Sequence, residues 1–395
     1  MRIARVLTRP NLGGPARQVM ASDPLLAERG HVVRVFCGEP EPGEGDLFDE
    51  LERRGVDTVR VPGLRRSGAP LRDLGVVRRL ARGLREFEPD VVHTHASKAG
   101  LLGRLAAPRG AARVHTFHGH VLEGYFSVAT SRLLTAMERA LARRTDAVVA
   151  VSDATRADLA RLRVAPDARI ATSPPGVDLE PFLALDPAPR RGPLRAAAGS
   201  DAFLVAFVGR LAAVKRPAFA GAVLRELRGL GVDARLVVLG DGPAQLLEEL
   251  VRAAGAERGS VLHLGAREDV ALVLAECDAV LSCSRNEGAP VALIEAAAAA
   301  RPAVAVGVGG VAEVVVDGDT GTVLPHDATP GEVARELARL AADPRLREQL
   351  GARARGRACE RYSAKGLADR LERIYRTALA RRGDVRFQEV PACGS

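Results

Sequence analysis

Short apolar runs alternate with helical stretches along almost the whole chain. The runs are rich in β-branched residues and lack the polar alternation of a strand with one face in water, which is typical of parallel strands covered on both faces. We expect such strands at residues 3–7, 32–36, 56–59, 91–93, 114–117 and 147–151, and again at 204–208, 236–239, 261–264, 279–281 and 304–306. Strands that alternate with helices predict a doubly wound α/β architecture.

One intervening stretch, residues 71–87, is typical of a helix with an apolar face and a basic face. Its apolar residues recur every three or four positions, at Leu71, Leu74, Val77, Leu80, Leu84 and Phe87. We expect this stripe to pack on a sheet. Arginines at positions 72, 78, 79, 82 and 85 lie beside it.

A break in the alternation divides the 395 residues into halves of similar size. Residues 176–200 are rich in proline, glycine and arginine and have no clear periodicity, which is typical of a linker. We expect one domain over residues 1–180, a linker over 181–200, a second domain over 201–355, helices over 356–380 that return to the first domain, and a tail over 381–395. Two doubly wound domains facing one another would form a central cleft at the carboxyl ends of their strands.

The composition is that of a globular protein. No window approaches the roughly 18 uninterrupted apolar residues of a membrane span. The first residues carry arginines within an apolar stretch, which predicts a strand and not a signal peptide. The five cysteines are scattered and form no C-x-x-C pair, which disfavours a disulfide scaffold and a structural zinc site. We therefore expect a cytoplasmic protein.

The formal charge of +8 comes almost entirely from arginine, because the lysines are only Lys98, Lys215 and Lys365. Abundant arginine and alanine are more typical of genome composition than of selection for a polyanion. Aromatic residues make up 3% of the chain and tryptophan is absent, so stacking side chains for nucleic acid are scarce. We expect no nucleic-acid partner, whereas a phosphate-bearing or membrane-surface partner is compatible with the charge.

Five of the eight histidines fall within residues 92–121, at His93, His95, His115, His118 and His120. Three interpretations apply: a metal site, the polar lining of a ligand cleft, or buried histidines with satisfied hydrogen bonds. No cysteine or acidic ligand motif accompanies them, and both groups fall where expected strands end. We favour the cleft lining and assign no metal ligand.

Glycines and cations follow the expected strands in the second half. Gly209, Arg210 and Lys215 come after the strand at 204–208, where a guanidinium and an ammonium could neutralise a diphosphate without a metal. Glycine turns at Gly240, and at Gly14 in the first half, allow close approach to a ligand or are simply turns. No G-x-G-x-x-G followed by an acidic residue about twenty positions later is present, which disfavours a nicotinamide-dependent oxidoreductase.

Two glutamates follow the strand expected at 279–281. Glu287 and Glu295 are separated by a little over two helical turns, so we expect both carboxylates to project roughly toward one side. No D-x-D motif appears where a metal-dependent sugar transferase would need one.

The ordered set of motifs resembles the family-4 glycosyltransferases, which are retaining, nucleotide-sugar-dependent enzymes of the GT-B fold. The resemblance spans nearly the whole chain and depends on the Gly13-Gly14 loop, TFHGH (116–120), VSDATRADL (151–159), PPGVD (174–178), GRLAAVKRP (209–217), GDGP (240–243) and NEGAPVALIEA (286–296). The family often has an aromatic residue and a second glycine after the first glutamate, whereas this chain has EGAP.

The resemblance implies a role for each matching residue. Arg210 and Lys215 would hold the donor diphosphate, with Gly14 beneath it and the Gly209 and Gly240 turns nearby. Glu295 would bind the nucleoside ribose. Glu287 would contact the transferred sugar together with the loop amides, and His118 would lie near the sugar's reactive end. The loop residues are Gly288, Ala289, Pro290 and Val291, and the candidates on the acceptor side are His95, Lys98, His120 and Tyr125.

The resemblance implies an N-terminal acceptor-binding domain and a C-terminal domain that binds a nucleotide sugar, with UDP favoured and no cofactor. The acceptor would be a lipid-linked glycan or a small molecule. The basic face of residues 71–87 is compatible with peripheral contact with an anionic membrane at its inner face, or with a core-packed helix whose arginines are solvated. Alternatives are a nucleotide-sugar 2-epimerase of the same fold and a non-catalytic nucleotide-sugar-binding protein.

Overall fold

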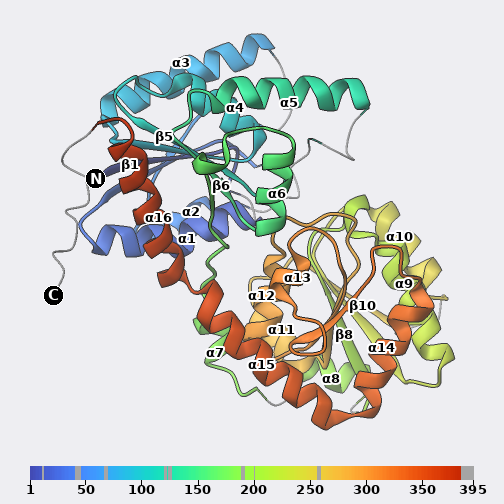
Figure 1. Cartoon of the computed structure of the whole chain (residues 1–395). Coiled ribbons are helices and arrows are strands. Elements are labelled where there is room, and N and C mark those ends of the chain that lie inside the picture. The colour runs from blue at the N-terminus through green and yellow to red at the C-terminus, as the bar shows by residue number, and fades with distance from the viewer. Residues whose placement is uncertain are drawn as a thin grey trace, which may run out of the picture. The chain divides into compact units, whose positions relative to one another are not determined.

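The chain forms two compact units, each with its own sheet and covering helices (Figure 1). The computed structural model describes residues 1–10, 13–40, 46–65, 70–119, 122, 127–187, 192–199, 201–255 and 259–383. The first unit comprises Met1–Gly176 and Ala364–Ser395, and the second comprises Val177–Ser363. The chain therefore crosses between the units twice.

In the described part of the first unit, seven strands form one parallel sheet in the order β3-β2-β1-β4-β5-β6-β7. They are β1 (Arg2–Leu7), β2 (Val32–Cys37), β3 (Asp57–Arg60), β4 (Val91–His95), β5 (Ala112–Phe117), β6 (Ala147–Ala150) and β7 (Ile170–Thr172). The reversal of order between β1 and β4 is the point at which doubly wound sheets bind ligands.

The second unit repeats this topology. Its described strands form a parallel sheet in the order β10-β9-β8-β11-β12-β13. They are β8 (Phe203–Val208), β9 (Ala234–Leu239), β10 (Val261–Gly265), β11 (Ala279–Ser282), β12 (Ala303–Val306) and β13 (Gly321–Leu324). The α/β fold class with two Rossmann-like domains is confirmed.

Helices cover both faces of each sheet. The first unit holds α1 (Gly14–Glu28), α2 (Phe48–Arg53), α3 (Pro70–Phe87), α4 (Ser97–Ala106), α5 (Val128–Ala142), α6 (Asp153–Arg161) and α16 (Ala364–Ala380). The second holds α7 (Glu180–Leu183), α8 (Pro193–Ala198), α9 (Pro217–Gly229), α10 (Ala244–Ala253), α11 (Val270–Glu276), α12 (Val291–Ala298), α13 (Val311–Val314), α14 (Pro330–Ala342) and α15 (Pro344–Tyr362). None of the described helices combines the length and the apolar composition that crossing a bilayer requires.

The apolar face of α3 differs by one position from the expected stripe. Leu80, Leu84 and Phe87 are buried in the core as expected, but Leu74 is 49% exposed and Val76 is fully buried in its place. Around residues 74–77 the buried positions therefore differ from the expected ones. A strict three- and four-residue spacing does not specify which side of a wide apolar face is turned inward.

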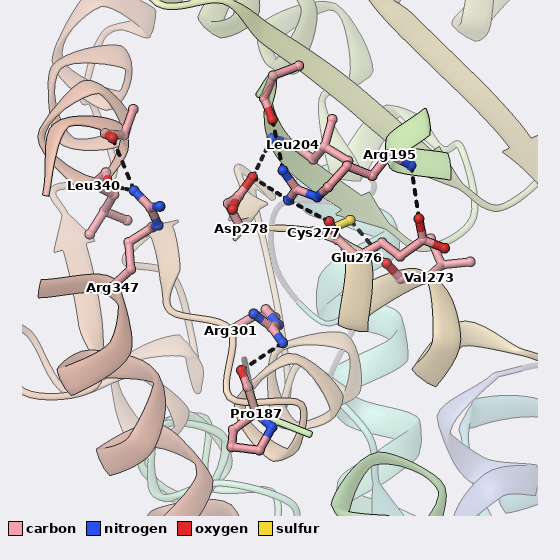
Figure 2. Close-up of polar contacts among 12 residues, drawn as sticks. Pro187, Arg195, Leu204, Val273, Glu276, Cys277, Asp278, Arg301, Leu340 and Arg347 are labelled. Atoms are coloured by element: carbon pink, nitrogen blue, oxygen red, sulfur yellow. Dashed lines mark hydrogen bonds and ion pairs between the residues drawn. The ribbon is translucent and has the colours of Figure 1, made fainter. Parts of the chain in front are cut away.

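The expected linker over 181–200 is wrong in its described part, which is folded onto the second unit. Phe182 of α7 is buried in that unit's core. Arg195 of α8 donates to Asp278 Oδ2 over 2.8 Å and to the Glu276 carbonyl over 2.7 Å, as Figure 2 shows. Because these partners lie about eighty positions away along the chain, the local composition contains no sign of this docking.

The chain returns to the first unit at Ala364, eight positions later than the expected start of the returning helices at 356. Helix α15 continues to Tyr362 and packs on α12 of the second unit. Helix α16 packs on α1 and β5 of the first unit. Its Tyr375 is fully buried and accepts a hydrogen bond from Arg5 of β1 over 2.6 Å.

Candidate active site

Lys215 and Glu287 form the central pair of the candidate site in the second unit. Lys215 Nζ lies 2.6 Å from Glu287 Oε1, and the Ser284 hydroxyl donates to the same oxygen over 2.6 Å. The side chains of Lys215 and Glu287 are 26% and 12% exposed, so both reach the surface of the unit. An ammonium has three donors, which leaves Lys215 able to bind a further acceptor while it contacts Glu287.

The local fold brings Lys215 to this position from the carboxyl end of β8. Gly209 has φ +132°, and a Cβ at that position would lie 3.5 Å from Lys215 Cε. A short 3₁₀ turn (Ala213–Lys215) follows, and Arg216, in the left-handed region at φ 57°, leads into Pro217 at the start of α9. The turn is joined to the loop after β11 because the Arg285 amide donates to the Val214 carbonyl over 2.8 Å.

The buried Cys283 contacts the backbone of the same turn. Its Sγ lies 3.5 Å from the Lys215 carbonyl oxygen and 3.7 Å from that of Arg216. Burial raises the pKa of the Cys283 thiol to about 12, so the sulfur keeps its proton and can donate it to these carbonyls. The cysteine therefore has a structural contact here, not the microenvironment of a reactive thiolate.

The Glu287 loop is held by a glycine pair after β12. Gly309 has φ +51°, and a Cβ added there would lie 1.9 Å from the Glu287 carbonyl oxygen. The Gly310 amide donates to that oxygen over 3.1 Å. This contact requires glycine at 309, and it places the Glu287 backbone against the start of α13.

Arg210 directly follows Gly209 and is exposed. Its guanidinium has no ion-pair partner among the residues that the structure describes. Gly240, at the end of β9, packs against this turn, and its own Cβ would lie 2.3 Å from the Gly209 carbonyl oxygen. Arg210, Lys215 and Gly240 thus share the carboxyl edge of the second sheet, where doubly wound domains bind ligands.

The spacing argument for the two glutamates is not supported by the structure. Helix α12 begins at Val291, with Pro290 as its N-cap, so Glu287 lies in the preceding loop and shares no helical face with Glu295. Glu295 lies on α12 and is 2% exposed. Of the expected loop amides, Pro290 has no N–H to donate, which leaves Gly288, Ala289 and Val291 as donors.

Asp317 and Asp319 have the letters of a D-x-D motif but hold the turn before β13. Asp317 accepts a hydrogen bond from the Val323 amide over 2.9 Å, and Asp319 pairs with Arg353 at 3.1 Å. Both carboxylates are therefore engaged in local structure. The described residues contain no group of three potential metal ligands.

The described histidines of the cluster form a chain of contacts in the first unit. His93 contacts Tyr375 Oη through Nδ1 and Thr116 Oγ1 through Nε2, both at 2.7 Å. His95 stacks on His93 with ring centroids 4.2 Å apart, and its Nδ1 lies 2.9 Å from His118 Nε2. His93, His95 and His115 are buried, whereas His118 is half-buried.

Only His118 of this cluster therefore retains access to solvent among the described histidines. Gln18 Nε2, from α1, lies 3.5 Å from His118 Nδ1. Gly14 is the first residue of the same helix. The structure thus brings the helix that follows the glycine loop next to the end of β5.

The other candidates on the acceptor side have different outcomes. Lys98, near the start of α4, is paired with Asp73 of α3, so its charge is already neutralised. His120 and Tyr125 lie outside the described residues.

Burial lowers the pKa of each of the four described histidines of the cluster. Desolvation is the main cause in each case, because a charged imidazole would lose its hydration there. The pKa of His93, His95 and His115 lies well below the ordinary value, and that of His118 falls to about 3. The four rings are therefore neutral near pH 7.

Acid is expected to destabilise the first unit. Unfolded histidines bind protons near pH 6.5, whereas the buried rings do so only at lower pH, so their stabilisation is complete above the unfolded pKa and is lost as the pH falls below it. Each ring contributes a slope of up to about 1.4 kcal/mol per pH unit in that window. Urea unfolding between about pH 5 and pH 7.5 measures the slope. His118→Asn should reduce it and exposed His326→Asn should not, and equal slopes in both variants would contradict the interpretation.

Comparison with known proteins decides the family. Residues 12–181 match the model described as Glycosyltransferase Family 4, and residues 195–357 match the one described as Glycosyl transferases group 1. A D-inositol 3-phosphate glycosyltransferase of Kineococcus radiotolerans is 31% identical, over 95% of this chain and 92% of the relative. The chain belongs to the family-4 glycosyltransferases. The expected enzyme class is therefore confirmed.

This glycosyltransferase is also similar to a relative from Escherichia coli and to a solved structure from Anabaena. The UDP-Gal:alpha-D-GlcNAc-diphosphoundecaprenol alpha-1,3-galactosyltransferase of Escherichia coli is 28% identical, over 78% of this chain and 80% of the relative. The structure of Anabaena Alr3699/HepE in complex with UDP-glucose superposes with a TM-score of 0.79 at 19% identity and covers 94% of this chain and 98% of that one. At this identity the likeness shows the fold, which is GT-B.

Several residues of the glycosyltransferase's candidate sites were not anticipated from the sequence. Ser284 shares the oxygen of Glu287, and its place three positions before that glutamate was the available signal. Tyr375 reaches His93 from 282 positions away. No local pattern indicates such a contact, because it depends on the path of the chain back into the first unit.

Proposed function

We propose that this glycosyltransferase moves a hexose or amino-hexose from a UDP-sugar to an acceptor hydroxyl with retention of configuration and without a metal. Arg210 and Lys215 stabilise the negative charge that develops on the departing diphosphate. The acceptor oxygen bonds to the anomeric carbon, the bond to the diphosphate breaks on the same face, and the departing phosphate oxygen takes the acceptor's proton. Glu287 and the amides of its loop contact the transferred sugar.

The observation that carries the proposal is the pairing of Lys215 with Glu287 beside the exposed Arg210, for which the described residues supply no ion-pair partner. Two cations at one strand edge provide the charge that a divalent ion would otherwise supply. Glu287, whose Oε1 also accepts a hydrogen bond from Ser284, holds the ammonium in place, so little reorganisation is needed when a diphosphate arrives. The family resemblance and the UDP-glucose bound in HepE support UDP as the nucleotide.

The acceptor is a lipid-linked glycan or a small molecule. The names of the relatives include both kinds, an undecaprenyl-diphosphate glycan and an inositol phosphate. For the lipid-linked case, exposed arginines on α3 would meet anionic headgroups. Sedimentation with vesicles of phosphatidylcholine and phosphatidylglycerol at low salt tests this, and a protein left entirely in the supernatant would count against the lipid surface.

Binding and turnover with a series of donors test the function. Because a ligand that binds the native state raises the unfolding temperature, a UDP-hexose should do so at lower concentration than GDP- or dTDP-sugars. Transfer to a panel of polyprenyl-diphosphate and polyol-phosphate acceptors should continue in excess chelator. Complete loss of transfer in chelator, restored by a divalent ion, would overturn the metal-independent mechanism. Conversion of the donor sugar without any acceptor would instead indicate a 2-epimerase.

A further inference from the structure

A hollow of about 260 Å³ lies in the first unit between edge strand β7 and helix α16. The Lys215 site belongs to the second unit. Four arginines line it: Arg169, Arg370, Arg373 and Arg381. No acidic side chain is among its lining residues, and the remainder are alanine, isoleucine and threonine. The hollow is therefore a concentration of positive charge contributed by two elements that are distant in sequence.

Carbonyl oxygens hold two of the guanidiniums in place. Arg381 donates to the carbonyl of Asp146 over 2.9 Å and to that of Ala168 over 2.5 Å. Arg370 donates to the carbonyl of Pro174 over 3.0 Å. A carbonyl fixes the direction of a guanidinium without cancelling its charge, and the planar guanidinium retains further N–H donors.

The other two arginines lack carboxylate partners. Neither Arg169 nor Arg373 forms an ion pair with any residue in the part of the chain that the structure describes. Arg376 on the same helix is different, because it pairs with Glu372 at 2.8 Å. Like charges around one small hollow repel one another unless an anion lies between them. The arrangement therefore has the electrostatics of an anion-binding site.

We propose that this hollow binds a small phosphorylated compound. Guanidinium forks match phosphate oxygens in geometry and charge. The volume is below the roughly 300 Å³ at which pockets for drug-sized ligands begin, which favours a small phosphate over a whole nucleotide sugar. No aromatic side chain lines the hollow for stacking on a nucleic-acid base, and none of the large exposed apolar side chains lies there to enter a membrane.

The hollow is lined by the two segments of the first unit that adjoin the points where the chain leaves that unit and returns to it. Thr172 of β7 lines the hollow, and the chain leaves the first unit just after it, at Gly176. Helix α16 begins where the chain returns, at Ala364. A bound phosphate would therefore join the two segments next to both crossings and stabilise the docking of α16 on the first unit.

Pyrophosphate is the probe, and saturating UDP blocks the donor site in the second unit. At constant ionic strength, calorimetry of the full chain with UDP present should still show one pyrophosphate bound. The double substitution Arg169→Gln and Arg373→Gln should weaken this binding by roughly tenfold or more, the scale for losing charge-assisted hydrogen bonds. Arg376→Gln, which removes one positive charge from the same helix as Arg373, should change it by less than about twofold.

A measurement on the unsubstituted protein tests the proposal even if the variants misfold. Pyrophosphate should protect Arg169, Arg373 and Arg381 from phenylglyoxal, read peptide by peptide by mass spectrometry, and leave Arg376 unprotected. Three outcomes would overturn the proposal: no pyrophosphate bound once UDP is present, an equal loss in Arg376→Gln, or displacement of pyrophosphate by phosphatidylglycerol vesicles, which would assign the arginines to a lipid headgroup.

Discussion

Replacing Lys215 with alanine is expected to lower turnover by about 10²-fold or more, the scale for losing one preorganised charge contact in the transition state. The ammonium stands 2.6 Å from Glu287 at the carboxyl edge of the second sheet. Its loss removes one of the two cations that face the proposed leaving diphosphate. Arg210 alone would have to carry the developing charge, from an exposed side chain that no described carboxylate holds in place.

The matched control is Lys365→Ala, because Lys365 lies on α16 with its side chain 79% exposed. It should leave turnover unchanged. Urea unfolding must accompany the kinetics, because Glu287 is 12% exposed and loses its ammonium partner in Lys215→Ala. Near-normal turnover in Lys215→Ala would remove the assignment of the diphosphate site.

Replacing Glu295 with alanine is expected to lower turnover by a similar factor of about 10² or more, for a different reason. The family resemblance assigns the buried Glu295 carboxylate to the ribose hydroxyls, and in that role its loss would leave the donor misplaced relative to both cations. The effect should appear in kcat/KM together with weaker binding of both UDP and uridine. Lys215→Ala should instead weaken the binding of UDP, which carries the diphosphate, and leave the binding of uridine unchanged.

Glu248→Ala is the control for this second variant, because Glu248 is an exposed glutamate on α10 of the same unit. Unfolding by urea must accompany the kinetics, since Glu295 is 2% exposed and its removal changes packing. A stable Glu295→Ala protein that binds UDP like the parent would show that the carboxylate has a structural role alone.

The sequence predicted the strands well because their signal is local. Runs such as 204–208 are apolar throughout, as burial on both faces requires, and the structure places β8 over them with one added residue. The two strands that were not expected, β7 and β13, are short and lie at the edges of the sheets. Their sequences, IAT and GTVL, have one buried residue each, so they lack the continuous apolar run that marks a strand covered on both faces.

The folded linker shows the limit of composition as a guide. Proline and glycine at 176–200 suggested an unstructured connection, yet Pro181 and Pro193 stand in the first turns of α7 and α8, where proline is tolerated. Whether such short helices persist depends on what they pack against. Here Asp278 and the core around Phe182 supply that support from distant parts of the chain.

By itself, the sequence determined the α/β class, the two repeated halves and the glycosyltransferase family. Apolar strands, helical periodicity and the ordered motifs each depend on residues that are close together along the chain, so they can be recognised without the structure. The tertiary structure decided which of those residues meet. It paired Glu287 with Lys215 and Ser284, paired Lys98 with Asp73, brought Tyr375 to His93, and gathered four arginines around one hollow. These contacts join positions up to 282 residues apart, so they exist only once the sheets, the loops at their edges and the returning helix are in place.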